Sequence, residues 1–297
     1  MKNIHFETII AVSVIFLFFA ACSSKEHSSV SLAELIQAET VMYEYPDSAL
    51  HILQNMKMPD AAQKLEHATW ALLMTQAKYK MYIEQNDSLA NIAYNYFMEQ
   101  EDAQRKALVL YLKGEIFHDN RNIEEAQNSL LRATTYAEKT NDYQLCHLIY
   151  AELGCIYILR FYKEYAIEAF NKSYQYALQS QNCKYIIASL IYLGRTYGQL
   201  ERFNQSIEYY QKAIEIAKEK HITRSVAIAS NELAGIYIEI KDYKKALYYS
   251  KQAINSSNIG VSKGQTNLVI GNIYREIGPI DSAYYYLNQV VGHKASV

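Results

Sequence analysis

The strongest constraint on the fold of this 297-residue chain is a glycine that returns at regular intervals inside helix-like segments. The positions lie 40, 40, 40 and 37 residues apart, at Gly114, Gly154, Gly194, Ala234 and Gly271, with alanine replacing glycine once. Each stands three residues before an aromatic side chain: Phe117, Tyr157, Tyr197, Tyr237 and Tyr274. Glycine inside a helix costs roughly 0.5–1 kcal/mol relative to alanine. Four such glycines in one register therefore indicate a structural need that recurs along the chain.

A second set of positions has the same period. Twelve residues after each glycine position comes a small side chain: Ala126, Ala166, Ser206, Ala246 and Ala283. Four residues further along stand Leu130, Phe170, Tyr210, Ser250 and Leu287. Small residues on two neighbouring helices let the helices approach closely, and the aromatic side chain fills the space beside them. The spacing predicts pairs of helices of roughly 15–18 residues each, at a rise of about 1.5 Å per residue.

This pattern resembles the tetratricopeptide repeat, in which Leu-Gly-x-x-Tyr is followed by small, aromatic and small residues at fixed offsets. The resemblance implies an all-α fold, a right-handed superhelical solenoid of antiparallel helix pairs with a period of about 40 residues. Five repeats are expected over residues 101–292, followed by a short tail over residues 293–297. Residues 31–100 are expected to hold an N-terminal helical hairpin and a degenerate repeat that opens at Trp70.

Composition narrows the possible functions. The chain has 10 glycines and 3 prolines, too few for the turns of a many-stranded β fold, and neither GxGxxG nor GxxxxGK occurs. Its 29 basic and 31 acidic residues leave no broad positive field for nucleic acid. The 8 histidines show no zinc-site spacing. We therefore expect a protein that is not an enzyme and has no cofactor, no metal site and no nucleic-acid partner.

The N-terminal residues predict secretion. Residues 8–21 form an uncharged apolar run of 14 residues, which is shorter than the ~20 residues that a membrane-crossing helix needs. Such a run behind a positively charged start suits a signal peptide over residues 1–21. The run ends in Phe-Ala-Ala followed by Cys22, which resembles the lipobox of bacterial lipoproteins. That resemblance implies lipid on Cys22 and a flexible tether over residues 22–30, and an ordinary signal peptide is the alternative.

Together the two resemblances indicate a tetratricopeptide-repeat lipoprotein of Gram-negative, Bacteroidetes-like bacteria. By analogy with such lipoproteins, Ser23 after the cysteine favours the outer membrane, with the body in the periplasm or exposed at the surface. Three acyl chains on Cys22 would exceed the two signals that stable anchoring requires. We therefore expect a membrane-anchored scaffold that binds a protein or a peptide.

In the tetratricopeptide family, positions 2, 5, 9 and 12 of each first helix line a concave groove. Carried over to this sequence, the polar groove positions are Tyr111, Glu115, His118, Arg195, Asn231, Asn272 and Arg275. No repeat carries the lysine–asparagine pair with which some family members clamp an acidic C-terminus. An extended peptide or a helix is therefore the expected ligand. The alternative is that these positions pack on neighbouring helices and admit no ligand.

Two other functions remain open from the sequence. Similar repeat proteins of Gram-negative bacteria share the opening pattern of residues 35–50 and continue into a membrane helix and a DNA-binding regulator. This chain would then be the sensor portion of a truncated regulator. The end of the sequence directly after the last expected helix fits either that interpretation or a partner that covers the last hairpin. A glycan-capture lipoprotein is a third interpretation, although such proteins are longer and add irregular loops.

Three cysteines remain once Cys22 is assigned to the lipid. Cys146, Cys155 and Cys183 are expected to be free thiols, since buried cysteine behaves as a small apolar residue. A disulfide between Cys146 and Cys183, on neighbouring first helices, is the alternative.

An Asp-Ser pair recurs where second helices are expected to begin, at residues 47–48, 87–88 and 281–282. Aspartate or serine at such a position is a good helix cap, worth about 1 kcal/mol. The pair also resembles an O-glycosylation acceptor of some Gram-negative bacteria. Capping is the expected role.

Overall fold

The computed structural model describes residues 32–256 and 260–292, and its regular structure there is entirely α-helical. The expected all-α fold is confirmed. The predicted signal peptide, Cys22, the tether and the tail lie outside these residues. No described helix is long and apolar enough to cross a membrane.

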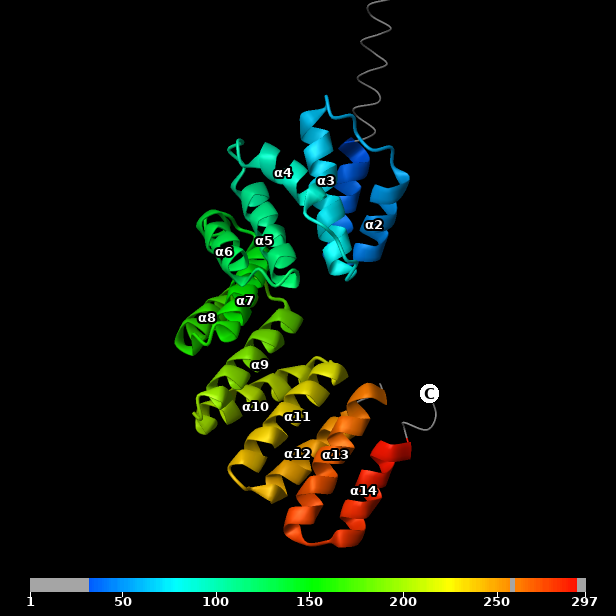
Figure 1. The fold of residues 1–297 in the computed structure, drawn as a ribbon, viewed down its shortest axis with the longest axis vertical. Coiled ribbons are helices and arrows are strands. Elements are labelled where there is room, and N and C mark those ends of the chain that lie inside the picture. The colour runs from blue at the N-terminus through cyan, green and yellow to red at the C-terminus, as the bar shows by residue number, and fades with distance from the viewer. Residues whose placement is uncertain (1–31, 257–259, 293–297) are drawn as a thin grey trace, which may run out of the picture. The chain divides into compact units, whose positions relative to one another are not determined.

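The chain divides into two compact units, Met1–Tyr136 and Ala137–Val297, which are described separately. In the first unit, a helix over residues 32–41 is followed by α2 (Pro46–Asn55), α3 (Lys64–Lys80), α4 (Ser88–Phe97), α5 (Ala103–Asp119) and α6 (Ile123–Ala137) (Figure 1). Helix α6 ends at the unit boundary. The second unit contains α7 (Tyr143–Leu159), α8 (Lys163–Gln179), α9 (Cys183–Gln199), α10 (Phe203–Glu219), α11 (Thr223–Glu239), α12 (Tyr243–Ser256), α13 (Gly260–Ile277) and α14 (Ile280–Gly292).

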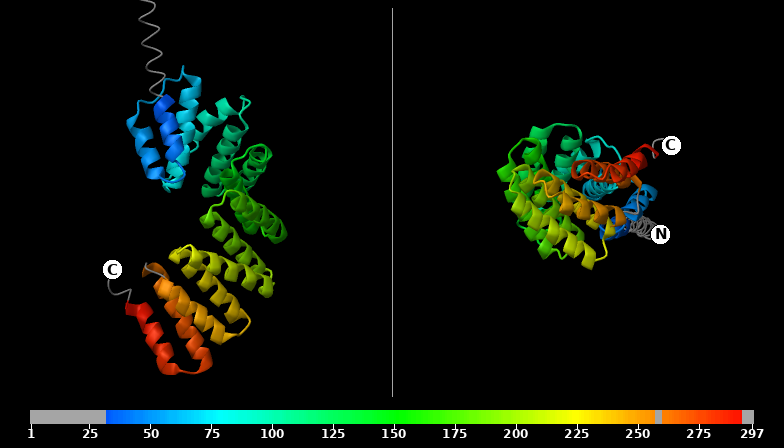
Figure 2. Two further views of the ribbon diagram at one scale, coloured as in Figure 1. Left: turned by 180° about the vertical axis from the view of Figure 1, so that it is seen from behind. Right: turned by 90° about the horizontal axis from the view of Figure 1, so that it is seen from below.

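The helices from α5 to α14 form five consecutive pairs. Their first helices begin at residues 103, 143, 183, 223 and 260, so successive starts lie 40, 40, 40 and 37 residues apart, as the glycine spacing predicts. Within the second unit, each helix from α8 to α14 contacts the helix before it, so the pairs lie side by side (Figures 1 and 2). The helix pair is therefore the repeating element.

The recurring glycines lie where a first helix meets the second helix of its own pair. A Cβ atom added to Gly154 would lie 2.4 Å from Cε1 of Phe170, and one added to Gly194 would lie 2.9 Å from Cε1 of Tyr210. Contacts of 2.8 and 2.7 Å would arise at the other two positions, Gly114 with Leu130 and Gly271 with Leu287. A close-packed interior has no room for such atoms. Contact between the paired helices therefore requires glycine, at the expense of helix propensity.

The pair α11–α12 explains the exception. It carries Ala234 at the glycine position, and the residue sixteen positions later is Ser250 instead of leucine, phenylalanine or tyrosine. Both side chains are completely buried. The smaller partner provides the space that the alanine methyl group needs, so the two positions vary together within one chain.

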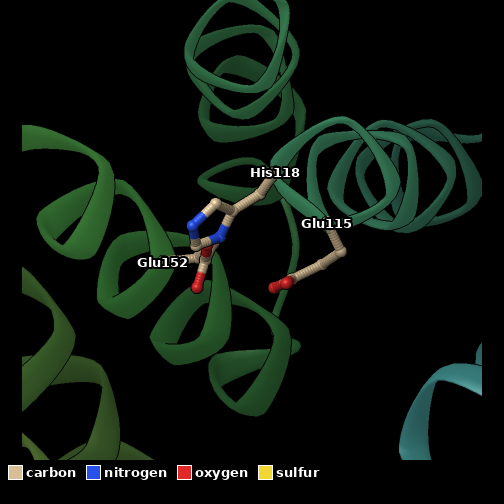
Figure 3. Close-up of side chains that lie close together, drawn as sticks. All are labelled: Glu115, His118 and Glu152. Carbon is tan, nitrogen blue, oxygen red and sulfur yellow. The ribbon is translucent and has the colours of Figure 1, made fainter. Parts of the chain in front are cut away.

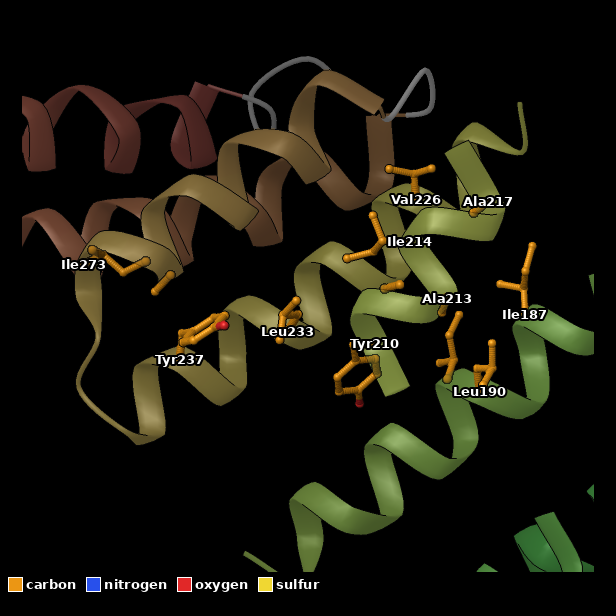
Figure 4. Close-up of a cluster of buried hydrophobic side chains, with 13 residues drawn as sticks. Ile187, Leu190, Tyr210, Ala213, Ile214, Ala217, Val226, Leu233, Tyr237 and Ile273 are labelled. Carbon is orange, nitrogen blue, oxygen red and sulfur yellow. The ribbon is translucent and has the colours of Figure 1, made fainter. Parts of the chain in front are cut away.

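Neighbouring pairs share one core in the second unit. Tyr210, which is 1% exposed, belongs to a cluster that also contains Leu190 of α9, Leu233 of α11 and Ile273 of α13 (Figure 4). Side chains from three successive pairs thus fill one interior. Each pair buries its apolar surface only in the company of its neighbours, as the repeat pattern predicts.

The tyrosines of the second helices divide into inward and outward sets. The repeat's own aromatic residue stacks on a tyrosine twelve positions later, with ring centroids 5.3–5.6 Å apart in the pairs Tyr197–Tyr209, Tyr237–Tyr249 and Tyr274–Tyr286. Offset stacking of this kind adds about 0.5–1.5 kcal/mol beyond the area that the rings bury. Neighbouring tyrosines on α12 and α14 face water instead, since Tyr248 is 62% and Tyr284 is 69% exposed.

Helix capping differs from the prediction. Side-chain caps close the starts of the first helices α5, α7 and α9, where Asp102, Asp142 and Asn182 each accept a backbone N–H. The Asp-Ser pairs do not cap in this way. Asp47 and Asp281 lie within the first turn, where a carboxylate favours the helix dipole, and Asp87 accepts from Asn91 Nδ2 at 2.9 Å instead.

All three described cysteines are free. Cys146 is buried, whereas Cys155 and Cys183 are half-buried. The alternative of a disulfide between Cys146 and Cys183 is therefore not realised in the structure.

Two alanine substitutions test the close approach of the paired helices. Gly154→Ala should lower the free energy of unfolding by about 1–3 kcal/mol, because its methyl group meets the Phe170 ring. Gly235→Ala, in α11, is the matched control: a Cβ there meets nothing within 4 Å, so the variant should gain about 0.5–1 kcal/mol. Urea unfolding followed by circular dichroism measures both changes. Equal effects of the two substitutions would contradict the packing account.

Candidate functional site

The first helices of the second unit are stacked against one another. Helix α7 contacts α9, and α9 contacts α11, in addition to their contacts with second helices. Among the predicted groove residues, Arg195 lies on α9, Asn231 on α11, and Asn272 and Arg275 on α13, which is joined to α11 by the Thr266–Asn231 hydrogen bond. We call these four residues the first-helix wall.

Arg195 is held across a repeat boundary by an ion pair. Its Nη2 donates to Oε1 of Glu232 at 2.6 Å, and its side chain is 43% exposed. The Tyr210 hydroxyl donates to the other carboxylate oxygen of Glu232 at 3.3 Å. Burial and the negative charge of Glu232 both raise the pKa of Tyr210, so the phenol remains a protonated donor. One buried tyrosine thus helps to orient a charge pair that reaches the surface.

The remaining predicted residues of the wall are less constrained. Asn231 is half-buried, and its Oδ1 accepts from the Thr266 hydroxyl of α13 at 3.3 Å. Asn272 is also half-buried, whereas the Arg275 side chain is 67% exposed and lies 3.7 Å from Glu276. Within residues 32–256 and 260–292, the only carboxylate paired with the accessible charge of Arg275 is this exposed neighbour.

The three predicted residues of the first unit all lie on α5. Tyr111 and Glu115 are each only 4% exposed, and His118 is partly exposed. The Tyr111 hydroxyl donates to the Tyr79 hydroxyl at 3.4 Å, and burial raises the pKa of Tyr111 well above its usual value. Glu115 and His118 stand one helical turn apart in Figure 3, which also labels Glu152 of the second unit. Tyr111 and Glu115 therefore present little surface to a ligand.

Sequence reasoning missed the partners of these residues. Glu232, Tyr210 and Thr266 occupy repeat positions outside the groove set, yet they determine how Arg195 and Asn231 are held. The signal was present, because Arg195 and Glu232 are 37 residues apart, close to one repeat period. Pairing residues about one period apart would have found this contact.

A buried histidine forms a second polar cluster in the second unit. His147 of α7 is 3% exposed, with Nδ1 2.9 Å from the Ser173 hydroxyl and 3.4 Å from the Ser189 hydroxyl. Its ring stacks on Tyr185 at a centroid distance of 4.3 Å. Burial lowers the pKa of His147 to about 4, although the Ser173 carbonyl raises it slightly. The imidazole is therefore neutral at pH 7, and it links α7, α8 and α9.

Comparison with known proteins agrees with this architecture. Family models described as tetratricopeptide repeat match residues 185–258 and residues 107–140. The chain contains tetratricopeptide repeats. They include the helices that carry Tyr111, Arg195 and Asn231. The close helix contacts at Gly114 and Gly194 also fall inside the matched residues.

One relative among curated proteins is the response regulator aspartate phosphatase I of Bacillus subtilis (strain 168). It is 27% identical over 121 residues, which are 41% of this chain but only 29% of that protein. The matched segment therefore spans less than a third of the relative.

Solved structures share the fold at low sequence identity. The apo form of RapI gives a TM-score of 0.74 at 14% identity, covering 88% of this chain and 75% of that one. A STAND protein with a tetratricopeptide repeat sensor from Pyrococcus horikoshii gives 0.73 at 17% identity, covering 89% and 42%. A Rap protein complexed with competence and sporulation factor gives 0.64 at 13% identity, covering 90% and 77%. These similarities show a common tetratricopeptide-repeat architecture.

The buried histidine makes stability depend on pH. His147 has a pKa of about 4 in the fold against 6.5 in its ordinary state, so the unfolded chain binds more protons between these values. The neutral imidazole's contribution to the free energy of unfolding is fully present above pH 6.5 and is lost as the pH falls toward 4. The loss is on the order of 3 kcal/mol. Urea unfolding at pH 7 and pH 5 should show a smaller decrease for His147→Gln than for the wild type. His221→Asn, at an exposed histidine of the same unit, is the control. An equal decrease in wild type and His147→Gln would contradict the assignment.

Proposed function

We propose that this chain is a membrane-anchored scaffold that binds a protein or a peptide along its first-helix wall. The observation that carries the proposal is the series of tetratricopeptide helix pairs whose first helices stack on one another. Repeats of this kind use the surface of stacked helices for binding. The solved complex of a Rap protein with competence and sporulation factor gives an example of this fold with a bound partner.

Arg195 is the residue of the wall best placed to recognise a ligand. Its bond to Glu232 lies between side chains that are 43% and 32% exposed, and an exposed ion pair contributes only about 0–1 kcal/mol. A carboxylate or carbonyl of an incoming chain can therefore share or replace Glu232 at small cost. Asn231 on the same wall offers an amide to the ligand backbone.

The membrane anchor rests on the sequence. The lipobox-like ending at Cys22 supports a lipid-modified N-terminus, and the residue after it supports the outer membrane. We propose no catalytic activity for this chain: the phosphatase name of its Bacillus relative belongs to that protein, of which the match spans 29%.

A second candidate function is a sensor. The STAND protein from Pyrococcus horikoshii carries a tetratricopeptide repeat sensor, and this chain covers 42% of it with a TM-score of 0.73. A chain of this kind would bind its ligand with the same wall and pass the signal to another part or partner. Both candidates require ligand binding, and they differ in whether binding is then signalled to an output.

Reversing the charge at Arg195 tests the wall. Crosslinking and recovery from native membranes should yield about tenfold less partner for Arg195→Glu than for the wild type, because the variant repels the groups that Arg195 would bind. Arg202→Glu is the matched control, since Arg202 also forms an ion pair across a repeat boundary, with Glu164 at 2.7 Å, but lies at the start of α10. Recovery of the same proteins by wild type and Arg195→Glu would contradict the binding proposal.

Replacing Cys22 with alanine tests the anchor separately. Without the thiol no acyl chain can be attached, so the protein should move from the membrane fraction to the soluble fraction after cell disruption. Mass spectrometry of the wild-type protein should show the added lipid. An alanine variant that stays in the membrane fraction would contradict the anchor and leave the binding proposal intact.

A further inference from the structure

A pocket of about 300 Å³ opens between three helices of the first unit. Its lining includes Asn91 and Tyr94 from α4, Lys113 and Phe117 from α5, and Glu125 and Arg132 from α6. This volume lies at the lower end of ligand pockets, about 300–1,000 Å³. It suits one or two side chains of a larger ligand. None of these residues belongs to the first-helix wall.

Two cations meet at Tyr94 in this pocket. Lys113 Nζ donates to Asn91 Oδ1 at 2.5 Å and lies 5.2 Å from the ring centroids of both Tyr94 and Phe117. Arg132 Nη2 donates to the Tyr94 hydroxyl at 3.1 Å, with Cζ 5.7 Å from the same ring. Cation–π contacts stabilise a positive charge only in part.

Neither cation has a carboxylate partner within the described part of the chain. Arg132 differs in this respect from Arg105, Arg195 and Arg202, each of which bonds to a glutamate. Lys113 is half-buried and lines the pocket together with Arg132. An anion entering the pocket would give both cations the counter-charge that they lack.

We propose that this pocket binds a carboxylate of an acidic peptide segment. Lys113 and Arg132 retain unused N–H donors for the carboxylate, with which arginine can form two parallel bonds. The amides of Asn95 and Asn128 offer donors and acceptors that match a peptide backbone. Ser129, which donates to the Leu110 carbonyl at 2.9 Å, fixes α6 against α5 beneath the pocket.

The charge balance favours a carboxylate over a phosphate. Lys113 and Arg132 give the lining two positive charges and Glu125 gives it one negative charge. A single negative charge on the ligand therefore cancels the net positive charge of the lining. A phosphate group carries about −1.5 to −2 at pH 7 and would meet excess repulsion from Glu125. The site is independent of Arg195, so its failure and that of the first-helix wall can be told apart.

Fluorescence anisotropy with a labelled peptide of alternating glutamate and glycine tests the pocket. The whole protein should bind this peptide and should bind the matching glutamine peptide about tenfold more weakly, since charge-assisted hydrogen bonds are lost. The Arg132→Gln variant should also bind the glutamate peptide about tenfold more weakly than the wild type. Because Arg132 is exposed, this variant should keep its fold, and circular dichroism verifies that. Glu125→Gln should strengthen binding severalfold, an effect that a merely structural role would not produce.

A control variant isolates the pocket. Lys251 also donates to a tyrosine hydroxyl and lies near its ring, at Tyr274, so Lys251→Met should leave peptide binding unchanged. Absence of binding to the wild type, equal affinity for the glutamine peptide, or undiminished binding by Arg132→Gln would each overturn the proposal. Displacement of the peptide by inorganic phosphate at lower concentration than by glutarate would overturn the assignment to a carboxylate.

Discussion

The contact between the two helices of each pair governs the rest of this structure. At Gly154 and Gly194 the backbone of the first helix comes so close to an aromatic ring of the second that a methyl group has no room. That proximity buries Phe170 and Tyr210 almost completely. In the second unit, Tyr210 and Phe170 each belong to a core cluster that neighbouring helix pairs share. Where the chain carries alanine in place of glycine, it also carries Ser250 in place of a large residue.

Polar contacts between repeats add a second, more variable level. Arg195 with Glu232 and Arg202 with Glu164 join residues 37 and 38 positions apart, and Lys172 with Glu138 joins residues 34 apart. These exposed pairs contribute little stability individually. They decide instead which charges are presented on each surface. A ligand-binding surface can therefore change while the apolar contacts between helices stay as they are.

The sequence predicted the helices and their register better than the candidate site. The glycine period predicts where the first helices begin, because packing imposes that period on the backbone. Long polar side chains obey no such strict rule, so the pocket around Lys113 could not be derived from the pattern. The Arg195–Glu232 pair could be found only by comparing residues about one repeat period apart. The expected capping role of Asp87 was wrong because its carboxylate bonds to Asn91 instead. Family positions placed Tyr111 in the groove set, yet its side chain is buried.

A double-mutant cycle between Gly154 and Phe170 tests the central contact most directly. In the wild-type background, the methyl group of Gly154→Ala meets the ring and destabilises the protein. With Phe170→Ala already in place the ring is absent, so the same Gly154→Ala change should stabilise the helix by about 0.5–1 kcal/mol. Urea unfolding of the four proteins measures the coupling. A change of sign between backgrounds is the predicted result, and the same destabilisation in both backgrounds would contradict the account.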